Sequence, residues 1–365
     1  MADAQATHLY RAIHAQPEAV RTLLADQGDP ARAAEKLARA GRILIAGIGT
    51  SFHATQVGEY LLRMAGADAW AVRSFEFVNY PRPLRSDDAV IVISHRGSKM
   101  FSAMAVERAK DAGVHTIAIT GKNTKLPRAD IMLETVEQDP SPTNSISYVG
   151  ALTRLAQIAA RLASLTGYAE QAQALERGLS QTPALMENIL AREDEVRQVA
   201  QEAVQRRIYF VGGGPNAATA TEGALKAKEA SYVTTEGFEL EQFLHGPEMA
   251  LEAEDLLIPI NVAGAAQQRM ADLLLAMSEV SERVWLIGAI PNAETEALFQ
   301  RPGWSRFALA DSTTLSAFPE ALTPLLAALP VQLLSNFLAA ARGTNADSFR
   351  QDHEPYKRAR TRLQL

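Results

Sequence analysis

The most suggestive group of reactive side chains lies in one short segment, between Glu222 and His245. Glu222, Lys226 and Glu229 share one face if this segment is helical, because residues three and four positions apart are neighbours on a helix. A carboxylate can serve as a general base when burial or a like charge raises its pKa, whereas a nearby lysine lowers it. The same spacing also occurs in exposed stripes that only stabilise a helix. The polar stretch that follows, ending in His245-Gly246-Pro247, favours proton-transfer chemistry.

Two further segments have the composition of anion-binding loops. Gly49, Thr50 and Ser51 follow one short apolar run, and the segment Ser94-His95-Arg96-Gly97-Ser98-Lys99 follows another. Hydroxyls and backbone N–H groups at the start of a helix suit a phosphate, and two cationic side chains add charge. Ser98 alone would equally fit a plain helix N-cap. Two such loops after strands of one sheet predict a phosphate site.

A dinucleotide site is the alternative for glycine loops of this kind. The first loop lacks the third small residue of the G-x-G-x-x-G pattern, because Phe52 stands there. The second half has Gly212, Gly214 and Ala217, but we expect no strand ending in an acidic residue about 20 residues further on. The sequence therefore favours a phosphate site without a nucleotide cofactor.

The chain contains an internal duplication. Arg42 to Gly49 is echoed by Arg207 to Gly214, and each segment is an apolar run that ends in Gly-x-Gly. Three further pairs of apolar runs follow in the same order in both halves, and these are 89–93 with 256–260, 116–119 with 284–287, and 131–136 with 306–310. Continuous rather than alternating runs are typical of parallel strands buried on both faces. Pro259 inside one run indicates an edge strand or a bulge.

Helical patterns such as 98–112 and 267–281 separate these runs. This alternation predicts an α/β fold with two doubly wound, flavodoxin-like parallel sheets in tandem. We expect an N-terminal helical segment, a first domain, a helical connector, a second domain and a tail. Their boundaries are 1–38, 39–167, 168–203, 204–342 and 343–365.

Composition excludes several classes of protein. The 365 residues are 47% hydrophobic and 21% charged with a net charge of -6. Apart from a short basic block near the end, at Lys357, Arg358, Arg360 and Arg362, there is no concentrated basic stripe of the kind that nucleic-acid surfaces carry. No apolar run is long enough to span a membrane, and the first residues do not resemble a secretory signal. There is no cysteine, and the seven histidines form no i, i+4 pair. We expect a cytoplasmic protein with no metal and no cofactor.

The segment Glu222-Gly223-Ala224-Leu225-Lys226-Ala227-Lys228-Glu229, followed by His245-Gly246-Pro247, resembles the SIS (sugar isomerase) family in its double-domain form. The loop Gly49-Thr50-Ser51 matches as well. The resemblance covers roughly residues 40 to 350. It implies that Thr50, Ser51, Ser94 and Ser147 contact a sugar phosphate.

The same resemblance implies that Glu229 moves a proton between C1 and C2 through an enediol-type intermediate. Glu222 and Lys226 would lie beside it. His245 would assist ring opening, and in related enzymes this histidine comes from the neighbouring subunit of a homodimer. The implied partners are a small sugar phosphate and a second copy of the chain, with no nucleic acid and no membrane.

Two departures from the family pattern leave the reaction open. The synthase-like phosphate loop reads Ser-Gln-Ser-Gly-Glu-Thr, of which only Ser94 and Gly97 remain, although His95, Arg96, Ser98 and Lys99 can still bind an anion. Glu354 stands where aminating members have an imine-forming lysine, and Lys357 follows three residues later. The sequence contains no cysteine, so it offers no cysteine nucleophile that could release ammonia from glutamine.

The expected activity is therefore aldose–ketose isomerisation or deamination of an amino sugar phosphate. One alternative is a phosphosugar-binding sensor without catalysis. Another is an ammonia-using isomerase subunit that works with a separate glutaminase.

Overall fold

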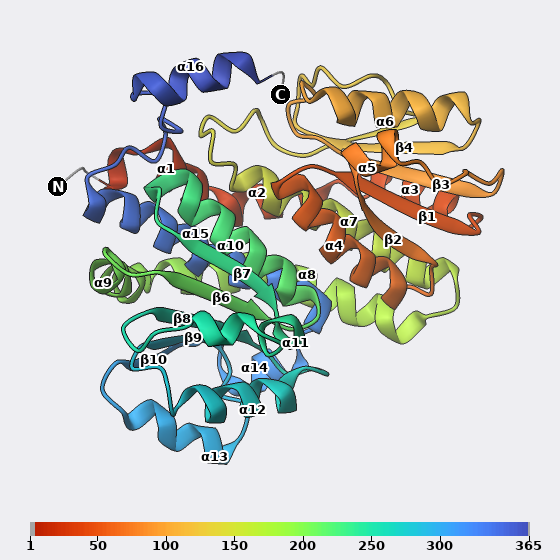
Figure 1. Cartoon of the computed structure of the whole chain (residues 1–365). Helices are drawn as coiled ribbons and strands as arrows, with labels where there is room; N and C mark the ends of the chain where they lie inside the picture. Colours follow the sequence, from red (N-terminus) through yellow and green to blue (C-terminus); the bar gives the residue numbers. More distant parts are fainter. Residues whose placement is uncertain (1–3, 364–365) are drawn as a thin grey trace. The chain divides into compact units, whose positions relative to one another are not determined.

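Two five-stranded parallel sheets form the framework of the computed structural model, which describes residues 4–363 (Figure 1). Their strand orders are β2-β1-β3-β4-β5 and β10-β9-β8-β6-β7. When the strands of each sheet are numbered in chain order and the second sheet is read from β7 to β10, both sheets have the 2-1-3-4-5 order of flavodoxin-like proteins. Helices cover both faces of each sheet, so the predicted pair of doubly wound α/β domains is confirmed.

The amino-terminal sheet holds the first two candidate loops at the carboxyl ends of its strands. Its strands are β1 (Arg42–Gly47), β2 (Ala69–Arg73), β3 (Asp88–Ile93), β4 (His115–Thr120) and β5 (Ile131–Glu134). The helices that belong with it are α2 (Gln16–Ala25), α3 (Gly28–Leu37), α4 (Thr50–Met64), α5 (Ser74–Asn79), α6 (Met100–Asp111) and α7 (Ile146–Leu165). A buried core under α5 and α6 includes Phe77, Val90, Val92 and Val106.

The carboxy-terminal sheet carries the acidic helix. Its strands are β6 (Ile208–Gly212), β7 (Thr235–Glu239), β8 (Leu256–Asn261), β9 (Val284–Gly288) and β10 (Trp304–Phe307). Its main helices are α9 (Glu193–Ala203), α10 (Pro215–Ser231), α11 (Leu240–Phe243), α12 (Gln267–Met277), α14 (Ser312–Ala317) and α15 (Thr323–Arg342). Shorter elements complete this part, namely η1 (Ala4–Ala6), α1 (His8–His14), η2 (Pro247–Ala250), α13 (Ala293–Glu296), η3 (Ala297–Gln300) and η4 (Glu320–Leu322).

One strand in each sheet lies outside the apolar runs that the sequence predicts. β2 and β7 are edge strands, and only the first residue of each is buried. Because β7 pairs with β6 and ends in Glu239, the expectation that no strand with an acidic end follows the second glycine loop was wrong. Pro259 is a second departure, because it lies in β8, between β6 and β9, and not at an edge. The β8–β9 register is constant on either side of Pro259, so no bulge is present, and the expectation of an edge or bulge was wrong.

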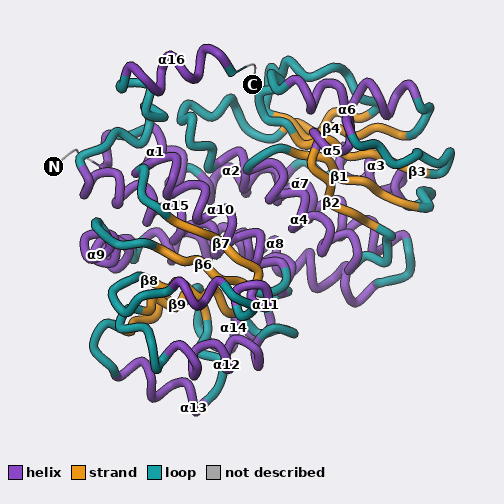
Figure 2. Tube along the Cα trace, viewed as in Figure 1, coloured by secondary structure: helices purple, strands orange, loops and turns teal. Residues whose placement is uncertain are grey.

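Two compact units can be distinguished among the described residues, and each combines segments that are distant in sequence. The amino-terminal unit consists of 15–140, 144–183 and 351–363, and the carboxy-terminal unit consists of 4–14, 141–143 and 184–350. Helix α8 (Ala169–Leu190) runs through the boundary near Pro183. Figure 2 shows the helices and strands of both units. The contiguous domain boundaries expected from the sequence stay a prediction.

Helix α15, together with the η4 turn before it, is long and apolar enough to cross a membrane by composition alone. In its most apolar window, however, 89% of residues are buried inside the protein. It packs against α10 and α9. Burial in the core therefore accounts for its apolar sequence.

The duplication extends to individual contacts. Arg42 at the start of β1 donates to Asp88 at the start of β3, with Nη2–Oδ2 at 2.6 Å. Arg207 beside β6 donates in the same way to Asp255 beside β8, with the corresponding distance at 2.7 Å. Each aspartate also accepts a backbone N–H from the residue three positions before it. The two units thus repeat the same local design.

Candidate active site

The first predicted loop lies at the N-terminus of α4. Gly49 precedes the helix with φ +56° and ψ -128°, a conformation that suits glycine because it has no Cβ. Thr50 and Ser51 form the first turn and are partly buried. Helix α4 has 15 residues, so the positive end of its dipole lies at this loop. The structure therefore brings Gly49, Thr50 and Ser51 together where a phosphate could bind.

The second predicted loop follows β3 and is held by the segment around Asp139. His95 Nε2 accepts the backbone N–H of Asp139 at 2.9 Å, and Arg96 Nη2 donates to the Asp139 carbonyl, also at 2.9 Å. Burial lowers the pKa of His95 to about 4, the positive charge of Arg96 adds to this, and a backbone contact with Glu137 opposes it. His95 is thus neutral at physiological pH, and its ring holds the loop.

The remaining predicted residues of this loop differ in exposure. Ser94 is buried at the end of β3, Ser98 is exposed, and Lys99 is partly buried just before α6. Gly97 has φ +68°, and a Cβ there would lie 2.1 Å from the backbone nitrogen of Leu126. The loop is thus tightly packed on its glycine side, while Ser98 reaches solvent.

Asp139 is a buried site residue that sequence reasoning missed. Its carboxylate accepts the backbone N–H of Ser145 at 3.0 Å and the hydroxyl of Ser147 at 3.4 Å, beside the start of α7. Its backbone binds His95 and Arg96. Asp139 therefore connects the loop after β3 with Ser147. The only sequence signal was an Asp-Pro turn before a long apolar helix.

The three acidic and basic residues predicted on one helix face do meet on α10. The Lys226 Nζ lies 2.5 Å from Glu229 Oε2 and 3.6 Å from Glu222 Oε1. The side chains of Lys226 and Glu222 are 1% and 0% exposed, whereas that of Glu229 is 18% exposed. Because the ammonium is buried between two carboxylates, these residues do not form the exposed helix-stabilising stripe that the sequence left as the alternative. Glu229 is the member that a reactant can reach.

His245 lies outside this ion-paired group. It follows α11, its side chain is 65% exposed, and its Nδ1 lies 2.8 Å from the carbonyl oxygen of Glu241. The Glu241 carboxylate lies 3.6 Å from the same nitrogen and is itself held by Arg269. The imidazole is therefore oriented by its own turn and open to solvent, as a residue that acts on a ligand or on a neighbouring molecule would be.

Comparison with known proteins identifies the family. The SIS domain model matches residues 36–159 and 203–302, once in each half and over more than half of the chain. The chain belongs to the SIS domain family. This agrees with the duplicated sheets and with the residues on which the resemblance was based.

Curated relatives of this SIS protein include glutamine–fructose-6-phosphate aminotransferases (isomerizing). The enzyme of Gloeobacter violaceus is 30% identical over 354 residues, which is 93% of this chain and 56% of the relative. The enzyme of Pyrococcus horikoshii is 28% identical over 351 residues, again covering 93% of this chain and 56% of the relative. The chain thus spans little more than half the length of these relatives.

Solved structures with the same fold include several phosphosugar proteins. The C-terminal domain of the glucosamine-fructose-6-phosphate aminotransferase of Francisella tularensis has a TM-score of 0.83 at 22% identity, covering 94% of this chain and 98% of that one. Tagatose-6-phosphate ketose/aldose isomerase of Escherichia coli has a TM-score of 0.77 at 20% identity, covering 96% of each chain. Glucosamine-6-phosphate deaminase of Thermotoga maritima has a TM-score of 0.69 at 18% identity, covering 94% and 97%.

The tail of this SIS protein begins against the helix that carries Glu229. Tyr232, in a left-handed conformation at the end of α10, accepts the backbone N–H of Arg350 at 2.8 Å, and its ring lies 4.9 Å from the Arg350 guanidinium. Further along, Glu354 and Lys357 form an exposed pair at 3.8 Å in the first turn of α16 (Glu354–Arg362). Glu354 therefore takes part in a surface ion pair.

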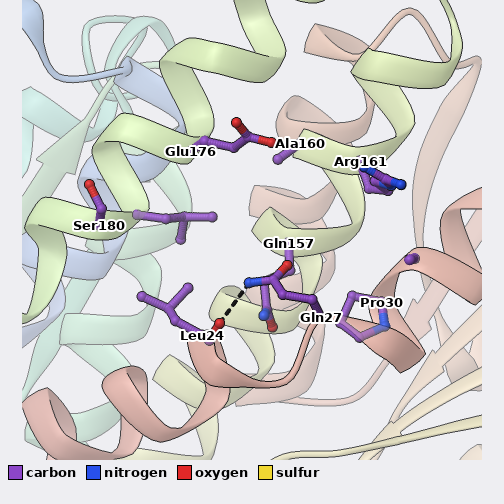
Figure 3. Close-up of a pocket in the computed structure, with 10 residues that line it drawn as sticks. Leu24, Gln27, Pro30, Gln157, Ala160, Arg161, Glu176 and Ser180 are labelled. Carbon is purple, nitrogen blue, oxygen red and sulfur yellow. Dashed lines mark hydrogen bonds between the residues drawn. The ribbon is translucent and has the colours of Figure 1, made fainter.

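A separate cavity of about 470 Å³ lies between α2, α3, α7 and α8 of the amino-terminal unit (Figure 3). Its lining includes Gln27, Arg161 and Glu176, and none of the predicted site residues. In Figure 3 the Gln27 amide donates to the Leu24 carbonyl, at 2.6 Å. This cavity is distinct from the predicted site residues.

Proposed function

We propose that this SIS protein is a phosphosugar enzyme that deaminates or isomerises an amino sugar phosphate of the glucosamine 6-phosphate type. The observation that carries the proposal is the buried group of Glu222, Lys226 and Glu229 on α10, with Glu229 at its accessible end. Relatives named as isomerizing aminotransferases, together with the fold shared with a ketose/aldose isomerase and a deaminase, support the same chemistry.

The charges of the α10 group suit a residue that takes up and releases a proton. Lys226 Nζ lies within ion-pair distance of both carboxylates, and of the three side chains only that of Glu229 is appreciably exposed. A proton can therefore pass between Glu229 and a bound reactant. Glu229 is assigned as the base that removes the proton from C2 and returns it to C1, while Lys226 and Glu222 hold its carboxylate in place.

The deamination is balanced by one water molecule. Moving the C2 proton to C1 converts open-chain glucosamine 6-phosphate into the 2-imine of fructose 6-phosphate. Water then adds to the imine carbon, and ammonia leaves. No external oxidant or reductant is required.

Binding of the phosphate is assigned to the two loops of the amino-terminal unit. The amides and hydroxyls of Gly49, Thr50 and Ser51 lie at the positive end of α4, and Lys99 supplies a cation before α6. Ser94 and Ser147 complete the proposed binding set. Ser147 is oriented by the Asp139 carboxylate, which indirectly links it to His95 and Arg96.

His245 is assigned to ring opening. Its exposure agrees with a role toward a neighbouring subunit, so we include a cytoplasmic homodimer with shared sites in the proposal.

The decisive experiment measures fructose 6-phosphate and ammonia formed from glucosamine 6-phosphate. Wild-type protein should produce equal amounts of both, and Glu229→Gln should lower kcat by about 10²-fold or more, as expected on loss of a general base. Glu236→Gln, an exposed carboxylate on β7, is the matched control and should retain full activity. Equal rates for wild type and Glu229→Gln would refute the assignment of the base.

A phosphosugar sensor is the second candidate. It is favoured by Glu354, which stands where the family resemblance implies an imine-forming lysine and instead forms a surface ion pair with Lys357. Saturable binding of glucosamine 6-phosphate without turnover, in the presence or absence of ammonia, would favour the sensor. Turnover in the aminating direction only when a glutaminase is added would instead favour an ammonia-using subunit.

A further inference from the structure

The carboxy-terminal unit repeats the geometry of the first phosphate loop. Gly214 precedes α10 with φ +55° and ψ -132°, almost the same values as those of Gly49 before α4. The loop after β8 likewise corresponds to the loop after β3, because Asp255 and Gly264 are separated by the same spacing as Asp88 and Gly97. A second position for a ligand anion is therefore built into the backbone.

The side chains at this second position are unlike those at the first. Ala263, Ala265 and Ala266 stand where the first loop has Arg96, Ser98 and Lys99. Asn216, which corresponds to Ser51, is buried and donates to the Thr323 hydroxyl at 2.8 Å. The cations and hydroxyls that would recognise a sugar phosphate have thus been replaced. Pro215, which stands where the first loop has Thr50, also lacks a backbone N–H, whereas its neighbours keep theirs.

A carboxylate from the same unit lies between the two loops. A Cβ on Gly264 would lie 2.2 Å from Cδ of Glu320, and a Cβ on Gly214 would lie 3.3 Å from its Oε1. The backbone N–H of Ala265 donates to this carboxylate. Glu320 begins the η4 turn that leads into α15, so its side chain is brought to the loops by the core helix of the unit.

Electrostatics explain why an internal anion is found here. Helix α10 has 17 residues, and the positive end of its dipole lies at this loop, where it favours a negative charge. An attached carboxylate binds without the entropy loss of an external ligand. Burial raises the pKa of Glu320, and the Ala265 N–H opposes this rise.

We propose that the Glu320 carboxylate permanently takes the place of the ligand anion in the carboxy-terminal unit, so that each chain binds a single sugar phosphate, in its amino-terminal unit. The statement that each chain binds one sugar phosphate rests on the proposed function. The statement that Glu320 occupies the second position is independent of that function, because Glu320 would exclude any phosphate-sized anion. Removing the Glu320 side chain should therefore open a new anion site.

The test separates the two positions by combining substitutions in the full chain. Arg96→Ala with Lys99→Ala weakens the first site, and inorganic phosphate is titrated by calorimetry into this double variant with and without Glu320→Ala. We expect at least about a tenfold gain in phosphate affinity when Glu320 is removed. Glu279→Ala, an exposed acidic residue of the same unit, should give no gain.

The outcomes distinguish this inference from the proposed function. A folded Glu320→Ala protein, verified by circular dichroism, that binds phosphate no better than its parent overturns the inference. If Glu320→Ala does not fold, Glu320→Ser opens the same space and keeps a polar residue at the start of the turn, and the same criterion applies. Absence of sugar-phosphate binding to wild-type protein, with phosphate gained by the Glu320 variant, would instead refute the proposed function.

Discussion

The side chain of Lys226 illustrates how strongly one residue can depend on its partners. Its ammonium is buried between the carboxylates of Glu222 and Glu229. Removal of one partner from a buried ion pair leaves an uncompensated charge in a poorly solvated place. The arrangement therefore stabilises the helix and positions Glu229 through the same contacts.

From this we predict that Lys226→Met lowers the free energy of unfolding by about 3–5 kcal/mol, because it removes the ammonium that is paired with the buried Glu222 carboxylate. Adding Glu222→Gln to Lys226→Met should restore part of the loss. Urea denaturation measures both effects. Lys228→Met, at an exposed position of the same helix, is the control and should change stability by less than about 0.5 kcal/mol. A Lys226→Met protein as stable as this control would contradict the burial argument.

His95 gives the protein a specific sensitivity to acid. Its pKa is about 4 in the folded protein, lower than the ordinary value of 6.5, mainly because of burial. Between these values the unfolded chain binds a proton that the folded chain excludes. This contribution to stability is therefore present above pH 6.5 and is lost as the pH falls toward 4.

When the pH falls from 7 to 5, the free energy of unfolding of the wild-type protein should fall by about 2 kcal/mol because of His95. The His95→Gln protein should not show this loss. The measurement compares urea midpoints of the two proteins at several pH values. His115→Gln, which alters an exposed histidine, should follow the wild-type curve. Parallel curves for wild type and His95→Gln would show that the ring is not protected from protonation.

At the residue scale, the sequence predicted contacts correctly where the side chains lie three or four positions apart on one helix. Glu222, Lys226 and Glu229 are close in sequence, so their contact follows from α10 alone. Asp139 and Glu320 were missed because their partners come from elements distant in sequence. Such contacts depend on the tertiary fold, which local patterns do not specify.

At the scale of elements, burial decided which strands could be predicted. The central strands β3 and β8 are buried over their full length and read as continuous apolar runs. The edge strands β2 and β7 have mixed exposure, and their sequences contain no clear period. In β7, glycine is required at position 237 because the strand passes directly over α10.

This close approach gives a further prediction. A Cβ at Gly237 would lie 2.5 Å from the carbonyl oxygen of Ala220 and 2.7 Å from Cα of Thr221. Gly237→Ala should therefore push β7 away from α10 and cost about 1–3 kcal/mol, as overpacking typically does. Thermal and urea unfolding measure the loss. Gly28→Ala, where the nearest atom would be 3.9 Å away, should be tolerated, and equal stability of the two variants would argue against the predicted clash.

At the scale of the whole molecule, duplication has produced two similar units whose loops carry different side chains. The amino-terminal unit keeps hydroxyls and cations in its loops, whereas the carboxy-terminal unit contributes the acidic helix and closes its own loop position with Glu320. Within the carboxy-terminal unit, His245 is exposed and separate from the Glu222–Lys226–Glu229 group. If a homodimer shares its sites, Glu229 and His245 of one site come from different chains.

This arrangement can be tested by mixing two inactive proteins. Glu229→Gln and His245→Asn are each expected to lack activity, but a heterodimer formed from them contains one site with both native residues. Random reassortment at equal concentrations should restore about a quarter of wild-type activity, since half of the dimers are mixed and half of their sites are intact. Glu229→Gln mixed with Glu222→Gln is the control and should restore nothing, because both changes lie on α10. If the first mixture also stays inactive after exchange of subunits is verified by native mass spectrometry, His245 acts within its own chain or not at all.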